Sequence, residues 1–362
     1  MNILIVSDCK EIGGTEIHIF QFIKLLIEDE NYVEVISTSI FSSNFAKIGI
    51  KIHEIDYDDT LKAAKNIKAL TTKNLFEIVI AFRWKAIIAS GIAYRSHNIR
   101  KVASIHSEFV PGSRYDNKNM PDVERITQIL NKYYNGIITA SVAIKNSLLK
   151  YGVEENKTTV IKSFVNLPDG KIVRKVKCGG NIILGYFGRL SKEKGVDLLP
   201  EICSKLMINH IEKKWKLFVY GKGELEYSLK ESIKNNNLEH VIELKGFTNR
   251  PYNEMNKIDI LIVPSRQEGL GSVILEAMWL GIPVISFEVG GISELVVDGV
   301  NGYLIQQYNL DCFSDRIKFL IEHDKLRQEM SQKTIRLSKE MYDFAKLYNA
   351  LKNYLLRIIG ED

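Results

Sequence analysis

The stretch from Ser265 to Ile305 constrains this chain most, because apolar runs alternate there with glycine turns. Ahead of it, the apolar run Ile258–Pro264 has the composition of a strand inside a parallel sheet. The turn EGLG at 268–271 follows, and then a helical pattern from about Ser272 to Leu280 that a glycine and a proline end. A strand, a glycine turn and a helix start in this order predict an anion site, because free backbone N–H groups and the helix dipole both favour negative charge there.

Two carboxylates flank this turn. Glu268 lies at its beginning, and Glu276 lies about one turn into the expected helix. A phosphate site with a carboxylate on each side suits a ligand with phosphates in its middle and hydroxyls at both ends. A nucleotide sugar fits that description.

The segment EGLGSVILEAMWLGIPVI, followed by GGISELV and DGVNGYL, resembles the group 1 glycosyltransferases, which are retaining enzymes of the GT-B fold. The resemblance implies an α/β protein with two Rossmann-like domains, whose parallel sheets face each other across a cleft. It implies that Glu268 contacts the donor sugar and that Glu276 holds the ribose hydroxyls. The donor diphosphate then meets the backbone of the residues between them, Leu270, Gly271, Ser272 and Val273.

At 362 residues, the chain is long for one domain and comfortable for two. We expect an acceptor-side Rossmann-like domain at 1–166 and a nucleotide-sugar-binding domain at 181–340. The basic, glycine-bounded stretch between them is interpreted as a linker at 167–180. The resemblance implies that the last helical segment, 341–362, packs back on the first domain.

A loop with two cations follows the apolar run at 182–187. Arg189 and Lys194 can close around one pyrophosphate, the first as a fork and the second as a point charge, although such loops are commonly just solvated. The segment GRLSKEKGVDLL also resembles the family, and this implies that the two residues neutralise the leaving diphosphate. We therefore expect catalytic roles for Arg189, Lys194, Glu268 and one histidine.

That histidine is His106, which follows a strand-like run at the edge where open α/β sheets bind ligands. It matches the cleft histidine of the family, near the reacting sugar. The glycines before the first expected helix allow either a close phosphate contact or a plain tight turn. The resemblance implies that Gly14 faces the donor diphosphate, and that Gly246 and Phe247 lie against the nucleotide base.

Two other patterns have competing interpretations. Asp56-Tyr57-Asp58 looks like a metal-binding DxD motif, but in its context it is better explained as a loop and helix cap, and we expect no metal site. The segment 61–73 places Lys62, Lys65, Lys68 and Lys73 along an amphipathic helix. They form either a solvated face or a peripheral docking surface for an anionic membrane.

The net charge of +5 is mild, and neither dense basic stripes nor a known module indicates nucleic acid as a partner. No apolar run approaches the length of a membrane span, and the scattered cysteines are typical of reduced thiols. We expect a cytoplasmic protein, at the inner face of the plasma membrane if it docks there. It should need no cofactor besides its donor substrate.

The expected reaction is metal-independent transfer of a sugar, with retention, to a hydroxyl of a glycan, a lipid-linked acceptor or a cell-wall polymer. UDP-hexose or UDP-N-acetylhexosamine is favoured as donor over GDP-mannose. Retention by a carboxylate nucleophile or by attack on the same face both stay open, and Glu268 is assigned no covalent role. The alternatives are a GT-B-fold sugar-nucleotide epimerase and a non-catalytic nucleotide-sugar-binding accessory subunit.

Overall fold

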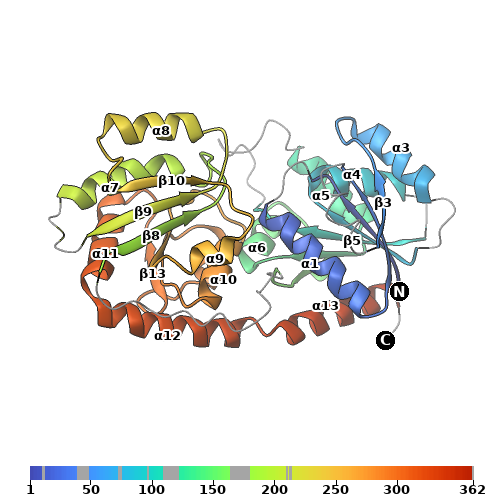
Figure 1. The fold of residues 1–362 in the computed structure, drawn as a ribbon. Coiled ribbons are helices and arrows are strands. Elements are labelled where there is room, and N and C mark those ends of the chain that lie inside the picture. Colours follow the sequence, from blue (N-terminus) through green and yellow to red (C-terminus); the bar gives the residue numbers. More distant parts are fainter. Residues whose placement is uncertain are drawn as a thin grey trace. The chain divides into compact units, whose positions relative to one another are not determined.

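The computed structural model describes residues 1–9, 13–38, 49–71, 76–95, 98–108, 122–163, 180–208, 211 and 214–360. The chain folds into two compact units (Figure 1). Unit 1 comprises Met1–Asn166 and Phe344–Asp362, and unit 2 comprises Leu167–Asp343. Of the linker expected at 167–180, all but Gly180 lies outside the described residues.

Unit 1 contains a seven-stranded sheet in the order β3-β2-β1-β4-β5-β6-β7, and every pair in it is parallel. The strands are short and mostly buried, as expected for a sheet covered on both faces. They are β1 (Asn2–Ser7), β2 (Tyr32–Ser37), β3 (Lys51–Glu54), β4 (Ile78–Phe82), β5 (Arg100–Ile105), β6 (Gly136–Thr139) and β7 (Thr158–Val160).

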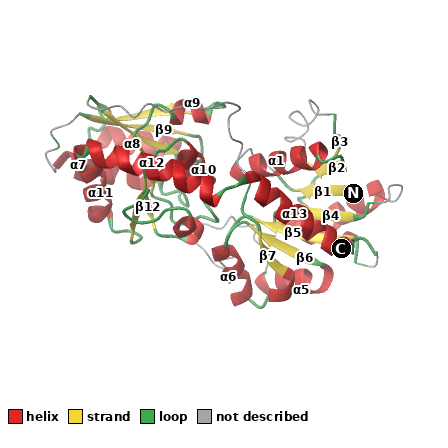
Figure 2. Cartoon of the chain, turned by 90° about the horizontal axis from the view of Figure 1, so that it is seen from below, coloured by secondary structure: helices red, strands yellow, loops and turns green. Residues whose placement is uncertain are grey.

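Helices cover both faces of this sheet, because alternate residues of each strand point to opposite sides. In β1, Leu4 and Val6 join one apolar core, whereas Ile3 and Ile5 join the other. The first core is completed by α3 (Thr60–Thr71), α4 (Trp84–Ala93), α5 (Val123–Tyr133) and α6 (Val142–Lys150). The second is completed by α1 (Gly14–Glu28) and the C-terminal α13 (Phe344–Ile359), which lie beside each other in Figures 1 and 2.

Unit 2 repeats the pattern with a six-stranded parallel sheet in the order β10-β9-β8-β11-β12-β13. The strands are β8 (Ile182–Phe187), β9 (Trp215–Tyr220), β10 (Ile242–Gly246), β11 (Ile260–Val263), β12 (Val284–Phe287) and β13 (Gly302–Ile305). The helices are α7 (Leu199–Ile208), α8 (Glu226–Asn235), α9 (Pro251–Met255), α10 (Ser272–Trp279), α11 (Leu310–Glu322) and α12 (Asp324–Met341). Its main core lies between the sheet and α7, α8 and α11.

Each sheet has one point where the strand order reverses. In unit 1 this point lies between β1 and β4, and in unit 2 it lies between β8 and β11. In open α/β sheets, ligands bind outside the carboxyl ends of the strands at such a reversal, because the two following loops diverge there. The residues that follow these four strands therefore form the candidate ligand-binding positions of the two units.

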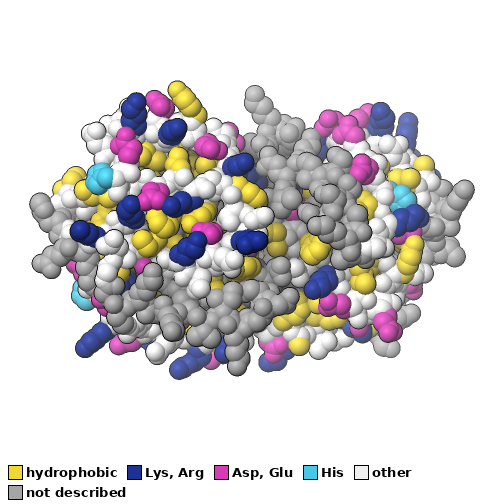
Figure 3. Space-filling model, in the orientation of Figure 1, with side chains coloured by type: hydrophobic (Ala, Val, Ile, Leu, Met, Phe, Trp, Pro, Cys, Tyr) yellow, Lys and Arg dark blue, Asp and Glu magenta, His cyan; other side chains and the backbone are white. Residues whose placement is uncertain are grey.

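The charged surface of the described residues is mixed. On the face shown in Figure 3, basic and acidic side chains are interspersed and do not form a single-sign field. Among the described helices, none combines the length and apolar character that crossing a bilayer requires.

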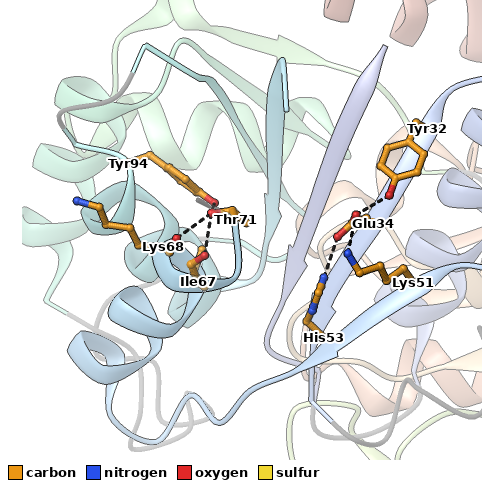
Figure 4. A network of polar contacts seen from close by, with 8 residues as sticks. All are labelled: Tyr32, Glu34, Lys51, His53, Ile67, Lys68, Thr71 and Tyr94. Carbon is orange, nitrogen blue, oxygen red and sulfur yellow. Dashed lines mark hydrogen bonds and ion pairs between the residues drawn. The ribbon is translucent and has the colours of Figure 1, made fainter. Parts of the chain in front are cut away.

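In unit 1, a buried carboxylate joins β2 to the edge strand β3 (Figure 4). The Glu34 side chain on β2 is 1% exposed and accepts hydrogen bonds from Tyr32 Oη at 2.5 Å and Lys51 Nζ at 3.1 Å. His53 Nε2 lies 2.8 Å from its second oxygen. Burial raises the pKa of Glu34, but the bonds to Tyr32, His53 and Lys51 outweigh it and hold that pKa below its ordinary value.

The Glu34 network predicts a pH-dependent loss of stability. A depressed pKa in the folded state contributes stability above the unfolded pKa, and this contribution disappears as the pH falls through the folded pKa. Glu34→Gln should lower the free energy of unfolding by about 1–3 kcal/mol at pH 7, and the gap to wild type should shrink below about pH 4. Thermal unfolding of wild type and variant at pH 7 and below about pH 4 measures this effect. Glu54→Gln, at an exposed position on β3, is the control. Equal melting temperatures of Glu34→Gln and wild type at pH 7 would contradict the prediction.

Candidate functional site

The site expected from the sequence begins where β11 runs into α10. Gly271 immediately precedes α10 with φ 90° and ψ 65°, a left-handed conformation that suits glycine. Gly271, as the N-cap residue, has no side chain that could cap this helix start. The N–H groups of the first turn, at Ser272 and Val273, therefore carry the positive end of the helix dipole without a carboxylate or hydroxyl from the N-cap residue.

The structure brings Lys194 to this turn. Its Nζ lies 2.8 Å from Oε1 of Glu268, whose side chain is 8% exposed. Ser265 Oγ donates a hydrogen bond to the same oxygen at 2.9 Å. Among the described residues, no hydrogen bond to the other oxygen, Oε2, accompanies these contacts, so Glu268 retains an acceptor for a ligand hydroxyl.

Arg266 fixes the loop that carries Lys194. Its guanidinium forms two parallel bonds with the Asp197 carboxylate, at 2.6 and 2.9 Å, and donates to the Lys192 carbonyl at 2.7 Å. The Arg266 backbone N–H also donates to the Glu193 carbonyl at 2.8 Å. Burial raises the pKa of Asp197, but the bonds from Arg266 and Lys192 outweigh it and leave that pKa below its ordinary value.

The two loops also touch through their backbones at Gly195. This residue has φ 68°, and a Cβ there would overlap the carbonyl oxygen of Pro264. Only glycine permits this approach, which places the loop after β8 against the loop after β11. The spacing between Lys194 and the start of α10 is thus set by main-chain contact as well as by ion pairs.

Arg189 lies on the same loop but is more open to solvent. Its side chain is 43% exposed and its Nη1 lies 3.4 Å from Oε1 of Glu193. Its carbonyl accepts a hydrogen bond from Tyr186 Oη at 2.7 Å, which holds the backbone beneath it. The guanidinium is therefore attached to a fixed main chain while its end remains exposed.

Glu276 has a different environment. It is 8% exposed, and burial raises its pKa to about 7. Tyr252 on α9 is near Glu276. The pKa of the Tyr252 phenol is raised mainly by burial and, to a smaller extent, by the charge of Glu276. A carboxyl poised near neutrality gains much from hydroxyls that donate hydrogen bonds to its charged form.

A cavity of about 330 Å³ lies beside Phe247. Phe247 is 58% exposed and follows Gly246, the last residue of β10. In one wall, Tyr220 Oη donates to Glu254 Oε2 at 2.7 Å, and Lys257 pairs with the same carboxylate at 2.8 Å. The complete lining is Phe218, Tyr220, Lys245, Phe247, Thr248, Glu254 and Lys257.

The remaining expected residues lie in unit 1. Gly14 is the first residue of α1, and Gly13 before it donates its N–H to Glu16 Oε2 at 2.9 Å. His106 follows β5, with Nε2 2.9 Å from Ser104 Oγ and Nδ1 3.1 Å from Ser163 Oγ. Burial lowers its pKa to about 4, so at neutral pH the imidazole is uncharged.

Sequence reasoning missed several of these residues. Arg266 had no recognisable signal, because its partner Asp197 lies 69 positions earlier in the chain. Tyr252 and the cavity residue Glu254, both on α9, were missed because their partners Glu276 and Tyr220 are also distant in sequence. His18 was also missed, and its ring centroid lies 4.3 Å from that of His106.

The DxD-like segment has a structural explanation. Asp56 Oδ1 accepts the N–H of Asp58 at 2.9 Å, which closes a tight turn. Asp59 Oδ1 accepts the N–H groups of Leu61 and Lys62, at 2.9 and 3.1 Å, at the start of α3. The interpretation as a loop and helix cap is therefore confirmed, with Asp59 as the capping residue.

The chain is similar to known glycosyltransferases over most of its length. The family model "Glycosyl transferases group 1" matches residues 171–337, and the model "Glycosyltransferase Family 4" matches residues 12–168. A poly(ribitol-phosphate) alpha-N-acetylglucosaminyltransferase of Staphylococcus aureus is 30% identical over 55% of this chain and 39% of its own length. An uncharacterized glycosyltransferase of Methanocaldococcus jannaschii is 36% identical over 44% of each chain.

These two matches thus span less than half of either relative. The structure of Anabaena HepE in complex with UDP-glucose has a TM-score of 0.83 at 19% identity, over 98% of this chain and 99% of that one. That likeness extends through both units and identifies the fold as GT-B. With two parallel-sheet Rossmann-like units and both family models matched, the chain belongs to the group 1 glycosyltransferases.

Proposed function

We propose that this protein transfers a sugar from a nucleotide diphosphate sugar to an acceptor hydroxyl, with retention at the anomeric carbon. The uncapped start of α10, with Lys194 held on Glu268 beside it, carries this proposal. The reaction separates a sugar cation from a diphosphate anion, and fixed positive charge where an anion develops is usually the largest single contribution to catalysis. Lys194, Arg189 and the N–H groups of Ser272 and Val273 supply that charge.

Glu268 has a separate task in this proposal. Lys194 and Ser265 occupy its Oε1, which leaves Oε2 to accept a hydroxyl of the donor sugar. Its negative charge also favours the electron-poor sugar of the transition state. We assign Glu268 hydrogen bonding and charge stabilisation but no covalent role. The leaving phosphate then accepts the proton of the acceptor hydroxyl in a same-face attack.

His106 binds as a neutral side chain. Its low pKa and its two serine neighbours make it a poor proton carrier at neutral pH. We assign it a hydrogen-bonding role toward the donor sugar, in which a hydroxyl replaces one serine contact. Gly14 contributes a backbone N–H to the diphosphate.

The nucleoside is assigned to Glu276, Gly246 and Phe247. Glu276 accepts the two ribose hydroxyls, and the base lies against the Gly246–Phe247 backbone. The donor we favour is UDP-hexose or UDP-N-acetylhexosamine, because the HepE structure contains UDP-glucose and the S. aureus relative is named for N-acetylglucosamine transfer. The acceptor we favour is a glycan, lipid-linked or cell-wall polymer, as that relative's poly(ribitol-phosphate) suggests.

The two alternative functions remain distinguishable by product analysis. An epimerase converts UDP-sugar without an acceptor, and an accessory subunit binds it without turnover. Lys194, Glu268 and Glu276 all have contacts or pKa values suited to a working donor site, which favours the transferase.

Removing either member of the ion pair beside α10 should abolish most turnover. Lys194→Ala and Glu268→Gln should each lower kcat by at least about 100-fold, equivalent to about 2.7 kcal/mol of transition-state stabilisation. UDP release from UDP-glucose, assayed in excess EDTA, measures this and tests metal independence. Lys230→Ala on the exposed side of α8 is the matched control. Donor binding without UDP release in the wild-type protein would favour the accessory subunit, and a mild loss in both site variants would refute the roles given to Lys194 and Glu268.

Donor affinity should rise with pH through neutrality. With a pKa of about 7, Glu276 is mostly protonated at pH 6 and mostly ionised at pH 8, and ribose hydroxyls bind the ionised form best. We expect UDP-glucose, whose own charge is constant here, to bind about tenfold tighter at pH 8 than at pH 6. Calorimetric titration tests this. Glu276→Gln should bind weakly at both values, and a wild-type affinity independent of pH would exclude this role.

We also propose that α3 docks the protein on anionic lipid at the inner face of the plasma membrane in the cytoplasm. Its outer face carries Lys62, Lys65 and Lys68 beside the exposed side chains of Leu61 (57%) and Leu70 (37%). Lys73 lies outside the described residues. Flotation should recover the protein with phosphatidylglycerol vesicles at low salt and much less with phosphatidylcholine. Equal recovery on both would refute the docking.

A further inference from the structure

The strand-order reversal of unit 1 carries polar residues that the donor site does not use. Asp8 follows β1, and Arg83 follows β4, which is its neighbour in the sheet. This is the position in unit 1 that corresponds to the loops of Lys194 and Glu268 in unit 2, relative to the sheet of each unit. Ligands bind at such reversals in open α/β sheets.

Arg83 has an unfavourable backbone conformation. Its φ of 68° and ψ of 158° belong to a region that is essentially restricted to glycine. Its Nη1 lies 2.5 Å from Oε1 of Glu16, and the side chain remains 37% exposed. Residues keep such strain where the surroundings enforce it, and these places are concentrated in ligand sites.

Asp8 is a buried carboxylate with an incomplete set of partners. It is 8% exposed, and its Oδ1 has no hydrogen-bond partner among the described residues. Burial raises its pKa, and the charge of Arg83 and the N–H of Ala86 offset this only in part. The buried Tyr57 Oη also lacks a partner there, and it lies near Asp8, whose charge adds to burial in raising the pKa of that phenol. A buried polar atom without a hydrogen-bond partner lowers the stability of the fold, so its presence suggests a function.

The charges around this point decide what it can bind. Asp8, Glu16 and Asp58 are acidic, whereas Arg83 and Lys85 are basic, and Lys85 already lies 3.9 Å from Asp58. An excess of carboxylates disfavours a phosphate, and a guanidinium bound to Glu16 disfavours a cation. A carboxylate that accepts and a guanidinium that donates suit the neighbouring hydroxyls of a sugar or polyol.

We propose that Asp8 and Arg83 form a subsite for neighbouring hydroxyls of a neutral sugar or polyol portion of the acceptor. Asp8 Oδ1 accepts one hydroxyl, and the exposed part of the Arg83 guanidinium donates to the next oxygen. Glu16 keeps Arg83 in place and is a positioning residue. This subsite rests on the proposed transferase function, because it serves the acceptor of that reaction.

Trp84, directly after Arg83, provides a local signal. Tryptophan fluorescence should be titrated with methyl α-glucoside, methyl N-acetyl-α-glucosaminide, ribitol and glycerol. We expect a saturable change with at least one probe in wild type, and no change in Trp84→Phe. Asp8→Asn should lower the affinity for that probe at least tenfold. The variant should melt no lower than wild type, because an amide removes a buried charge but keeps an oxygen for the Ala86 N–H.

Each other outcome overturns the subsite. If no probe gives a saturable change, a buried water satisfies Oδ1 and the assignment is wrong. If Asp8→Asn binds the probe as well as wild type, or loses melting temperature together with affinity, Asp8 is structural. UDP-glucose titration of the same wild-type protein separates the two proposals: retained donor binding without probe binding refutes the subsite alone, whereas absent donor binding refutes the transferase function.

Discussion

The candidate donor site depends on the buried guanidinium of Arg266. With its side chain 5% exposed, Arg266 bonds to Asp197 and the Lys192 carbonyl, and its own carbonyl accepts from Gln307 at 2.9 Å. It thereby joins the loops that follow β8, β11 and β13. Leaving such a charge buried without its partner costs about 3–5 kcal/mol. Loop conformations that separate Arg266 from Asp197 are therefore strongly disfavoured. Lys194 reaches Glu268 because Arg266 and the Gly195 contact hold its loop in place.

The two units use one topology with different chemistry at the point where strand order reverses. In unit 2, the loops bring a lysine, a carboxylate and an uncapped helix start together, which suits a phosphate. In unit 1, the start of α1 has its own carboxylate, Glu16, and Arg83 is bound to that carboxylate. The excess of acid there suits neutral hydroxyls. This difference in local charge supports the proposed placement of the donor diphosphate at unit 2 and of acceptor hydroxyls at Asp8 and Arg83.

Local sequence patterns predicted the secondary-structure elements of unit 2 better than its side-chain contacts. The turn and helix from Ser265 onward could be predicted because apolar runs, glycines and a proline act over a few residues, and α10 starts at the expected Ser272. The role of Arg266 could not be predicted, because nothing in the sequence distinguishes it from an arginine at the surface. Only the fold brings Asp197 to it. The pKa of Glu276 depends on the burial of its side chain in the folded unit, which no local pattern reveals. The strain at Arg83 is likewise a property of backbone angles alone.

A crystal structure of the protein with UDP tests the central claim most directly. The account predicts that the β-phosphate lies within hydrogen-bond distance of Lys194 Nζ and of the N–H groups of Ser272 and Val273, with the ribose hydroxyls on Glu276. A nucleotide bound elsewhere in unit 2, or a diphosphate that contacts neither Lys194 nor the start of α10, would contradict it.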